Sequence, residues 1–479
     1  MVSTVNTDVV VASITINAAH SLTIDADGTL EVTGSLTNNA GNAGLNILSN
    51  SSSTGSLIHN TAGVSANVER YIAAAEWTTG TDGWHLLSSP VAAQSISGDW
   101  TPSGTGNDYD MYIFDETKVN EYWLNQKVPA NNITTFETGK GYLVAYEQSG
   151  IRLFTGTLNS SDVTISSLSN SGIASAYPGW HLVGNPFASA IDYDLGTWTK
   201  TNIDVEIQVW DEIASSYKTS TEVGGIVPAM NGFMVHTSGS GVLAIPNNAR
   251  THDAANWYKS GEEYILLKAN DLETNMSQSS IVRFNALATE AYDTDFDSYF
   301  LQGFAPAFYS ETGGNLYALN TLPEVTGSMV IPFGFSKNGS SEFSIELSKS
   351  ISGTSVFLTD KKTNIVTNLT ETPVYNFSAA EGDDANRFTI HFSSVGIDDV
   401  NSSSDIRVYT SGGNINVSLQ QNSNAVVKIY SLTGQLVLQG NTGGKSLATF
   451  NATSLHDGIY IVSLVSGEQT ISRKIVLRK

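Results

Sequence analysis

Aromatic side chains able to bind a carbohydrate are concentrated in the middle of the chain, where all eight tryptophans lie between residues 77 and 257. Exposed aromatic rings serve in glycan sites because the C–H faces of a sugar stack on them while polar groups take its hydroxyls. Two adjacent pairs, Tyr122-Trp123 and Trp257-Tyr258, contain tryptophans without an aromatic counterpart in the internal repeat of the chain. We predict these four residues as glycan contacts. Partial burial at a domain junction, above all for Trp257, is the alternative. The aromatic residues that obey the repeat, Trp84 with Trp180 and Phe114 with Trp210, are expected to be core anchors.

Three carboxylates stand at alternate positions in one short segment, at Asp293, Asp295 and Asp297. Oxygen-rich loops of this kind bind calcium, although this one lacks the glycine at position six and the later glutamate of an EF-hand. Calcium is therefore the one cofactor that the sequence leaves open. A solvated acidic loop without metal is the alternative.

Signatures of catalysis are missing from the sequence. It has no Gly-x-Ser-x-Gly elbow, His-Glu-x-x-His helix, P-loop or dinucleotide fingerprint, and its zero cysteines exclude thiolate chemistry and Cys-ligated zinc. The duplicated His85 and His181 are expected to serve packing, because two catalytic copies need not coexist. A non-catalytic protein is expected, and a polysaccharide lyase or glycoside hydrolase of unrecognised family stays open, since such an enzyme needs only two converging carboxylates. The pairs Asp115-Glu116 and Asp211-Glu212 are candidates, but they too are duplicated and are expected to sit in hairpin turns.

The overall charge narrows the classes of partner. The 479 residues carry a net charge of −23, and charged residues make up only 14% of the chain. Nucleic acid and anionic membranes both demand clustered lysine and arginine, so neither is an expected partner. No apolar run approaches the roughly 18 residues that span a bilayer. The first residues show no basic region followed by an apolar one, so no signal peptide is expected in this copy.

The first segment shows short alternating triplets separated by turn-forming residues. Ile14-Thr15-Ile16, Leu22-Thr23-Ile24 and Leu30-Glu31-Val32 recur every eight residues. Short strands at a fixed period are typical of a parallel β-helix, in which each strand stacks on the next coil. We predict a β-helix-like cap over residues 1–70, with meander strands of a sandwich as the alternative.

An internal duplication follows the predicted cap. The motif at residues 83–90, Gly-Trp-His-Leu-Leu-Ser-Ser-Pro, recurs at residues 179–186 as Gly-Trp-His-Leu-Val-Gly-Asn-Pro, 96 positions later. Two further blocks keep the same order, one of them at an offset of 91. Alternating residues with glycine and proline between them predict two antiparallel β-domains, over residues 71–165 and 166–258.

The remaining sequence predicts two further β-modules. Alternating segments over residues 259–396 favour a β-sandwich, and a serine-rich linker separates it from residues 401–479, which favour a small Ig-like sandwich. The charge changes sign between them, because residues 401–479 carry +4 and residues 1–400 carry −27. The expected fold class is therefore all-β and multidomain.

The last module resembles the C-terminal sorting domain of proteins exported by the type IX secretion system of Bacteroidota. The resemblance rests on three motifs in order, at residues 427–435, 455–462 and 473–479. The residues that carry the sorting signal in this resemblance are Gly434, Gly458, Tyr460, Lys474, Leu477, Arg478 and Lys479. One departure is His456-Asp457 before Gly458, where the family more often has proline or alanine. Lys474, Arg478 and Lys479 also combine positive charge with a strand edge that a receptor could use.

By implication of the resemblance, the type IX translocon and sorting machinery are partners, and the preceding residues are cargo that is secreted or held on the outer face of the outer membrane. The expected function is adhesion, or recognition of an extracellular polysaccharide or surface protein, by the aromatic-rich centre. A structural role in a surface layer or filament is a further alternative.

Overall fold

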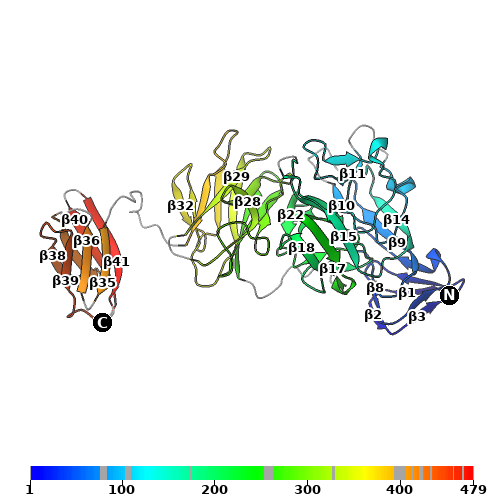
Figure 1. The fold of residues 1–479 in the computed structure, drawn as a ribbon, viewed down its shortest axis with the longest axis horizontal. Coiled ribbons are helices and arrows are strands. Elements are labelled where there is room, and N and C mark those ends of the chain that lie inside the picture. Colours follow the sequence, from blue (N-terminus) through cyan, green and yellow to red (C-terminus); the bar gives the residue numbers. More distant parts are fainter. Residues whose placement is uncertain are drawn as a thin grey trace. The chain divides into compact units, whose positions relative to one another are not determined.

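The computed structural model describes residues 2–75, 83–102, 109–172, 175–252, 263–325, 329–392, 406–411, 414–419, 424–431, 434–456, 458–466 and 469–477. The chain divides into two compact units, Met1–Ser393 and Ser394–Lys479. Within the described ranges the helical elements are three-residue 3₁₀ turns, at Asn42–Gly44, Gly98–Trp100, Pro129–Asn131 and Asn247–Ala249. All other regular structure is strand, which confirms the predicted all-β class (Figure 1). No helix in the described part of the chain is both long enough and apolar enough to span a membrane.

The first unit begins with a parallel β-helix, as predicted. Its parallel ladders join β1, β4, β7 and β9 on one face, β2, β5 and β8 on a second, and β3 and β6 on a third. Side chains such as Ile24, Leu30 and Leu45 point inward and are fully buried. The strands are β1 (Val2–Val5), β2 (Asp8–Val11), β3 (Ile14–Ile16), β4 (Ser21–Ile24), β5 (Thr29–Val32), β6 (Leu36–Asn38), β7 (Leu45–Ile47), β8 (Ser56–His59) and β9 (Ser65–Ile72).

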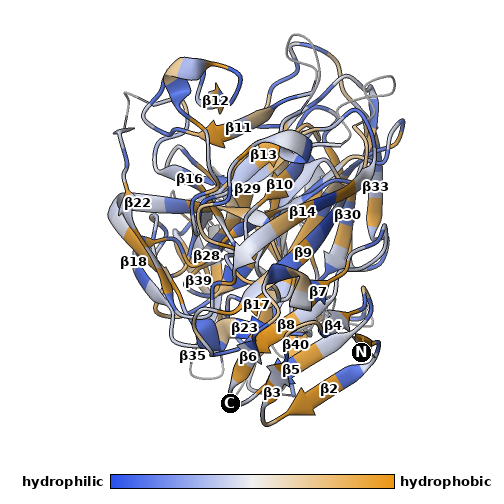
Figure 2. Cartoon of the chain, turned by 90° about the vertical axis from the view of Figure 1, so that its right-hand side faces the viewer, coloured by the Kyte–Doolittle hydropathy of each residue, from blue (hydrophilic) through white to orange (hydrophobic). Residues whose placement is uncertain are grey.

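The first coil of the β-helix leaves apolar side chains in solvent. Strand β2 is coloured mainly as hydrophobic in Figure 2, and its Val10 is 66% exposed. At the other end of the helix, β14 (Gly150–Thr157) pairs with β9 in antiparallel orientation. The β-helix therefore continues directly into the repeated region.

Two β-sheets of the same topology follow. In the first repeat the order is β10-β13-β11-β12, formed by β10 (His85–Leu87), β11 (Met111–Phe114), β12 (Trp123–Asn125) and β13 (Tyr142–Val144). In the second repeat β16 (Trp180–Gly184) pairs with β22 (Gly232–Ile245), which pairs with β19 (Gln208–Asp211), which pairs with β20 (Ser216–Thr219). The pairing is the same in both, with β22 in the place of β13.

The equivalence extends further than the sequence motif. Strand β15 (Val163–Leu168) pairs with the end of β22, just as β9 pairs with β14. In register, Leu168 lies opposite Gly241, and the equivalent residues of the first repeat, Ile72 and Gly150, also lie opposite each other. Strand β18 (Thr199–Ile203) also pairs with β22. A small sheet of β17 (Ala190–Asp192), β21 (Ile226–Val227) and β23 (Arg250–Thr251) completes the second repeat.

The two repeats pack against each other through exchanged contacts. Leu87 of the first repeat forms a β-bridge with Asn231 of the second, and the equivalent residues Val183 and Lys140 form the reciprocal bridge. The amide of Ser88 donates to the carbonyl of Met230 at 2.8 Å, and the amide of Gly184 donates to the carbonyl of Gly139 at 2.9 Å. Because each contact recurs with the repeats exchanged, the interface has the pseudo-two-fold symmetry of an isologous homodimer, here formed within one chain.

A β-sandwich formed by one large curled sheet ends the first unit. Its strand order is β32-β31-β34-β29-β27-β28-β25-β24-β30-β33, with β26 beside β28. The core holds buried phenylalanines such as Phe308, Phe333 and Phe343. The strands are β24 (Tyr264–Asp271), β25 (Ser277–Phe284), β26 (Ser298–Tyr299), β27 (Ala307–Thr312), β28 (Asn315–Leu322), β29 (Val330–Ser336), β30 (Glu342–Lys349), β31 (Phe357–Asp360), β32 (Ile365–Asn368), β33 (Val374–Ser378) and β34 (Phe388–His391).

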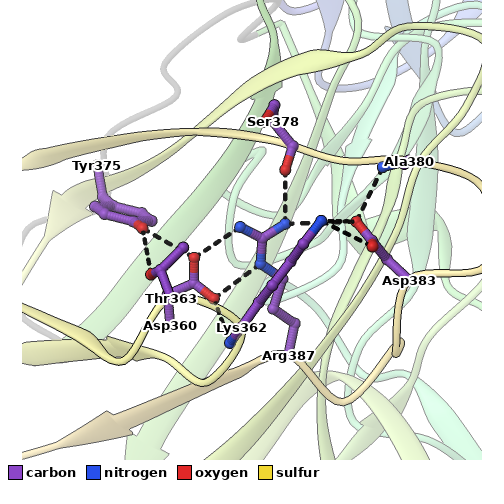
Figure 3. Close-up of polar contacts among 8 residues, drawn as sticks. All are labelled: Asp360, Lys362, Thr363, Tyr375, Ser378, Ala380, Asp383 and Arg387. Atoms are coloured by element: carbon purple, nitrogen blue, oxygen red, sulfur yellow. Dashed lines mark hydrogen bonds and ion pairs between the residues drawn. The ribbon is translucent and has the colours of Figure 1, made fainter.

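A buried ion pair joins the two ends of this sheet (Figure 3). Arg387 donates to Asp360 through Nε at 2.9 Å and through Nη2 at 2.7 Å, and its Nη1 donates to the carbonyl of Ser378 at 2.7 Å. Tyr375 on β33 donates to the same carboxylate at 2.9 Å. Burial alone would raise the pKa of Asp360, but hydrogen bonds from Arg387, Tyr375 and the amide of Lys362 hold it at about 2. The charged pair therefore closes the curled sheet.

The sandwich is attached to the second repeat by polar contacts. Gln208 Nε2 donates to the carbonyl of Tyr299 at 2.6 Å, and the amide of Phe304 donates to the carbonyl of Ser215 at 2.9 Å. A side chain on Gly303 would stand 2.7 Å from the Ser215 oxygen, so only glycine permits this close approach. These contacts hold the segment 299–305 against the second repeat.

The second unit is an antiparallel sandwich of two sheets, in the orders β35-β36-β39 and β38-β37-β40-β41. Its core contains buried aliphatic residues such as Val417, Ile429 and Val462. The strands are β35 (Ile406–Ser411), β36 (Asn414–Leu419), β37 (Val426–Ser431), β38 (Leu436–Asn441), β39 (Leu447–Asn451), β40 (Gly458–Ser466) and β41 (Gln469–Leu477). The last strand, β41, lies at the edge of its sheet, as the sequence predicted for the basic end of the chain.

Candidate functional site

Aromatic residues of the first repeat gather around one hairpin. Phe114 at the end of β11 pairs in register with Trp123 at the start of β12, and their rings lie 4.9 Å apart at 76°. Tyr122 stands next to them, with its ring 4.6 Å from that of Tyr177, which precedes β16. The hairpin therefore holds three rings on one side, and Tyr177 connects them to the second repeat.

The second repeat and the sandwich face this hairpin with rings of their own. Trp210 on β19 lies 5.0 Å from Tyr217 on β20 and 5.9 Å from Phe304 of the sandwich. Beneath them Leu86 and Leu182, equivalent residues of the two repeats, pack with Met234 in one cluster. Three parts of the first unit thus meet at an aromatic junction.

A cavity of about 440 Å³ opens at this junction. Its size falls in the usual range for small-molecule sites, which are mostly apolar with a few placed polar groups. No charged side chain contributes to its described lining. The aromatic lining residues are Trp84, Tyr112, Phe114, Tyr122, Trp123, Tyr177, Trp210, Tyr217 and Phe304.

The tyrosines supply the polar groups of the cavity, together with Gln302. Burial and a hydrogen bond to Asp110 raise the pKa of Tyr112 to about 12. Burial and the contact with Tyr122 raise the pKa of Tyr177 to about 12. These hydroxyls are therefore neutral at physiological pH. The Tyr112 hydroxyl donates to Asp110 and can accept a hydrogen bond from a ligand, whereas the Tyr177 hydroxyl accepts from Tyr122 and can donate one. The cavity can hold a ligand with apolar faces and hydroxyl groups.

Two of the four predicted glycan contacts lie in this cavity, namely Tyr122 and Trp123, and both are half-buried. Trp257 and Tyr258 fall outside the described residues, so the prediction for them stays as it was. Trp84, Phe114 and Trp210 were expected as core anchors because they obey the repeat. Trp180 is buried as expected, but its equivalent Trp84 is only half-buried and lines the cavity.

The duplicated acidic residues do not enter the cavity lining. Asp115 and Asp211 stand where the two hairpin turns begin, close to the expected position, and accept hydrogen bonds from the amides of Thr117 and Ile213 in those turns. His85 and His181 each contact a backbone carbonyl, that of Ala73 at 3.2 Å and that of Ser169 at 2.8 Å. Both histidines hold neighbouring backbone in place, as their duplication indicated.

The three aspartates of the predicted calcium loop do not converge on one point. No group of three or more His, Asp and Glu side chains in the described residues is placed to hold a metal ion. Asp297 is buried and accepts the amides of Thr321 at 2.7 Å and Asp293 at 2.8 Å. Burial raises its pKa to about 6. The geometry supports a role in shaping the loop, and calcium binding remains a prediction.

The sorting residues occupy distinct positions in the second unit. Gly434 has φ +79°, a left-handed conformation that favours glycine in the turn before β38. Tyr460 and Leu477 are buried in the core, and Tyr460 donates to the carbonyl of His456 at 2.8 Å. Gly458 begins β40 opposite Leu477. The side chain of Lys474 and all of Arg478 and Lys479 lie outside the described residues.

Comparisons with known proteins identify both parts of the chain. A family described as "Domain of unknown function (DUF8693)" matches residues 1–223 and 211–392. The family described as "Secretion system C-terminal sorting domain" matches residues 386–478. The chain is therefore a type IX secretion cargo protein with duplicated repeats, and its sorting domain supports export to the cell surface or the medium.

Other comparisons add nothing to the function. Curated proteins give no match. Among solved structures, a chain titled "Biofilm associated protein - BSP domain" aligns with 11% sequence identity over 90% of this chain and 98% of that chain, at a TM-score of 0.13. A TM-score this low carries no argument about fold or function.

Proposed function

The chain belongs to the family described as a domain of unknown function (DUF8693), and from that premise we propose that it is a non-catalytic recognition protein that binds an extracellular glycan in the aromatic cavity. The observation that carries the proposal is the cavity of about 440 Å³ lined by rings from both repeats and the sandwich. Export by the sorting domain brings this cavity to the medium or the cell surface.

The chemistry of the lining supports a sugar as the ligand. Sugar rings present C–H faces that pack on aromatic rings, and their hydroxyls need donors and acceptors. Tyr112, Tyr122 and Tyr177 provide hydroxyls beside the rings of Trp84 and Trp123. The absence of carboxylates from the described lining favours binding over hydrolysis, which needs a carboxylate pair at the bound sugar.

Binding of the full chain to an array of bacterial and plant polysaccharides tests the proposal. Trp123→Ala should reduce the affinity for the bound glycan about tenfold or more, because central aromatic contacts carry much of the binding energy. Tyr409→Ala is the matched control, since Tyr409 is an exposed aromatic residue of the second unit. Failure to bind any polysaccharide, or equal affinities of the Trp123→Ala variant and the unchanged chain, would refute the glycan proposal.

A second candidate function is cleavage of a polysaccharide, because one hollow does contain two carboxylates. Glu290 and Glu311 both line a hollow of about 650 Å³ on the sandwich, together with Lys361. Two carboxylates across a cleft are the minimum for glycoside hydrolysis. Release of reducing ends from polysaccharides that is lost in both Glu290→Gln and Glu311→Gln would favour this function over binding alone.

A further inference from the structure

The aromatic cavity has a neighbour with which it shares a wall. A second hollow, of about 560 Å³, lies between the second repeat and the sandwich, and Tyr177 lines both spaces. The segment 299–304 also runs along both, because Tyr299 and Phe300 line the second hollow while Leu301 to Phe304 line the first. The first cavity and the second hollow are therefore adjacent, and Tyr177 and the segment 299–304 lie between them.

The second hollow is more polar than the first. His236 lines it, and its Nδ1 lies 2.9 Å from Oδ1 of Asp204, which is completely buried. Tyr292 donates its hydroxyl to the same carboxylate oxygen. Asn170 and Asn315 add amide groups to the lining. Because Asp204 engages Nδ1, Nε2 is the nitrogen of His236 that remains for a further partner.

Aromatic rings continue along the wall of the second hollow. The ring of Tyr299 lies 4.5 Å from that of Tyr292 at 24°, and 4.6 Å from that of His236. Trp180 also lines this hollow, with its ring 5.2 Å from that of His236. A sugar chain leaving the first cavity past Tyr177 would thus meet further rings and, beside them, amide and hydroxyl groups.

We propose that the two hollows form one groove, which binds a neutral, linear polysaccharide over several consecutive sugar units. The inference rests on the proposed function and specifies its ligand. Among the described lining residues, neither hollow contains a lysine, arginine, aspartate or glutamate side chain. The chain as a whole carries −23, which repels acidic polysaccharides such as polyuronates. A neutral polymer is the partner that fits both observations.

The length dependence of binding tests the groove. Laminari-, cello- and malto-oligosaccharides from disaccharide to hexasaccharide are titrated into the full chain by calorimetry, with oligogalacturonides as the acidic series. In one neutral series, the affinity should rise about tenfold or more from the shortest to the longest member. A tenfold rise corresponds to about 1.4 kcal/mol of additional binding free energy from the added sugar units. The acidic series should bind more weakly at every length.

A blocked variant separates the groove from the first cavity. Ser238 is exposed on β22 and lines only the second hollow, so Ser238→Trp fills that hollow without touching the core, and Ser238→Ala is its control. Ser238→Trp should bind the disaccharide normally and lose the gain with length. Affinity that is independent of length, a gain that survives Ser238→Trp, or preference for the acidic series would overturn the groove and leave the proposed function standing. Absence of binding in all series, together with absence of binding to every polysaccharide of the array, would overturn both.

Discussion

His85 Nδ1 of the first repeat lies 2.5 Å from Oε1 of Glu212 of the second repeat. The equivalent residues, His181 and Glu116, are connected through Ser169, whose carbonyl lies 2.8 Å from His181 Nε2 and whose hydroxyl donates to the Glu116 carboxylate. The same exchange relates the backbone bridges of the two repeats. Both the side-chain and the backbone contacts therefore show that the repeats pack as two copies of one module. The aromatic cavity lies at the interface between these copies.

The two glutamates of these pairs should contribute unequally to stability. Glu212 is 45% exposed, so Glu212→Gln should cost less than about 1 kcal/mol of unfolding free energy. Glu116 is buried and accepts the Ser171 hydroxyl at 2.9 Å as well as the Ser169 hydroxyl, so Glu116→Gln should cost about 1–3 kcal/mol. Urea unfolding of the full chain measures both. Equal losses of unfolding free energy in the two variants would show that the different burial of Glu116 and Glu212 does not affect stability.

Gly141 should be required for the close packing of the repeats. A Cβ at this position would stand 2.5 Å from the Val183 carbonyl oxygen and 2.6 Å from Leu182 Cγ, so Gly141→Ala forces backbone apart. Overpacking of this kind costs about 1–3 kcal/mol. Gly150→Ala is the matched control, because its Cβ would meet nothing within 4 Å. Differential scanning calorimetry should show a lower melting temperature for Gly141→Ala alone; a similar shift in both variants would contradict the packing argument.

Local patterns predicted those parts of the fold in which neighbouring residues determine the structure. Alternation in the triplets of residues 14–32 predicted the β-helix, because the inward residues of each coil need only stack on the next. The motif at residues 83–90 and 179–186 identified the repeats. The equivalence of β9 with β15 escaped prediction, since the two strands share alternation but few residue types, and only their pairing registers reveal it.

The site was predictable only in part, because it is assembled from three distant segments. Tyr122 and Trp123 stood out as an aromatic pair outside the repeat pattern. Trp84 and Trp210 obeyed the pattern and were expected in the core, but no sequence rule reveals that packing leaves them at an open junction. Phe304 and Tyr177 had no distinguishing signal, since their roles depend on the sandwich docking against the second repeat.

The ion pair of Asp360 and Arg387 should make the sandwich sensitive to acid. The pKa of Asp360, about 2, lies below the ordinary value of 3.8. The ion pair therefore contributes its full stabilisation above pH 3.8, and this contribution is lost as the pH falls through about 2. Asp360→Asn should destabilise the first unit by about 3–5 kcal/mol at neutral pH, because it removes the bidentate counter-charge of buried Arg387 and leaves only the more distant Asp383, 3.8 Å from Arg387 Nη1.

Circular dichroism of the full chain as a function of pH measures this effect. The unchanged chain should lose part of its strand signal below about pH 4. Lys362→Ala is the control, because Lys362 Nζ pairs with Asp383 at the edge of the cluster and its side chain is 45% exposed. A variant Asp360→Asn as stable as Lys362→Ala would show that the buried pair does not hold the sheet closed.

Removal of calcium should leave the melting temperature unchanged. Both oxygens of Asp297 already accept backbone amides, and Asp293 accepts the amide of Thr289 at 2.6 Å, so these carboxylates are engaged without a metal. Thermal unfolding of the full chain is compared in calcium chloride and in EDTA. A calcium-dependent rise in melting temperature that disappears in Asp295→Asn would instead establish the loop as a calcium site, since a ligand that binds only the folded state stabilises it.

The two glycines of the sorting signal should separate folding from recognition. Gly434→Ala must place a side chain at φ +79°, which costs roughly 1 kcal/mol or more. Gly458→Ala meets only ordinary contacts, the nearest being Tyr460 Cε2 at 3.9 Å, so the second unit should fold with unchanged stability. Fractionation of a type IX-competent host reports export of each variant, and urea unfolding reports stability. Lost export of a stable Gly458→Ala variant would assign Gly458 to contact with the secretion machinery, whereas normal export would remove it from the signal.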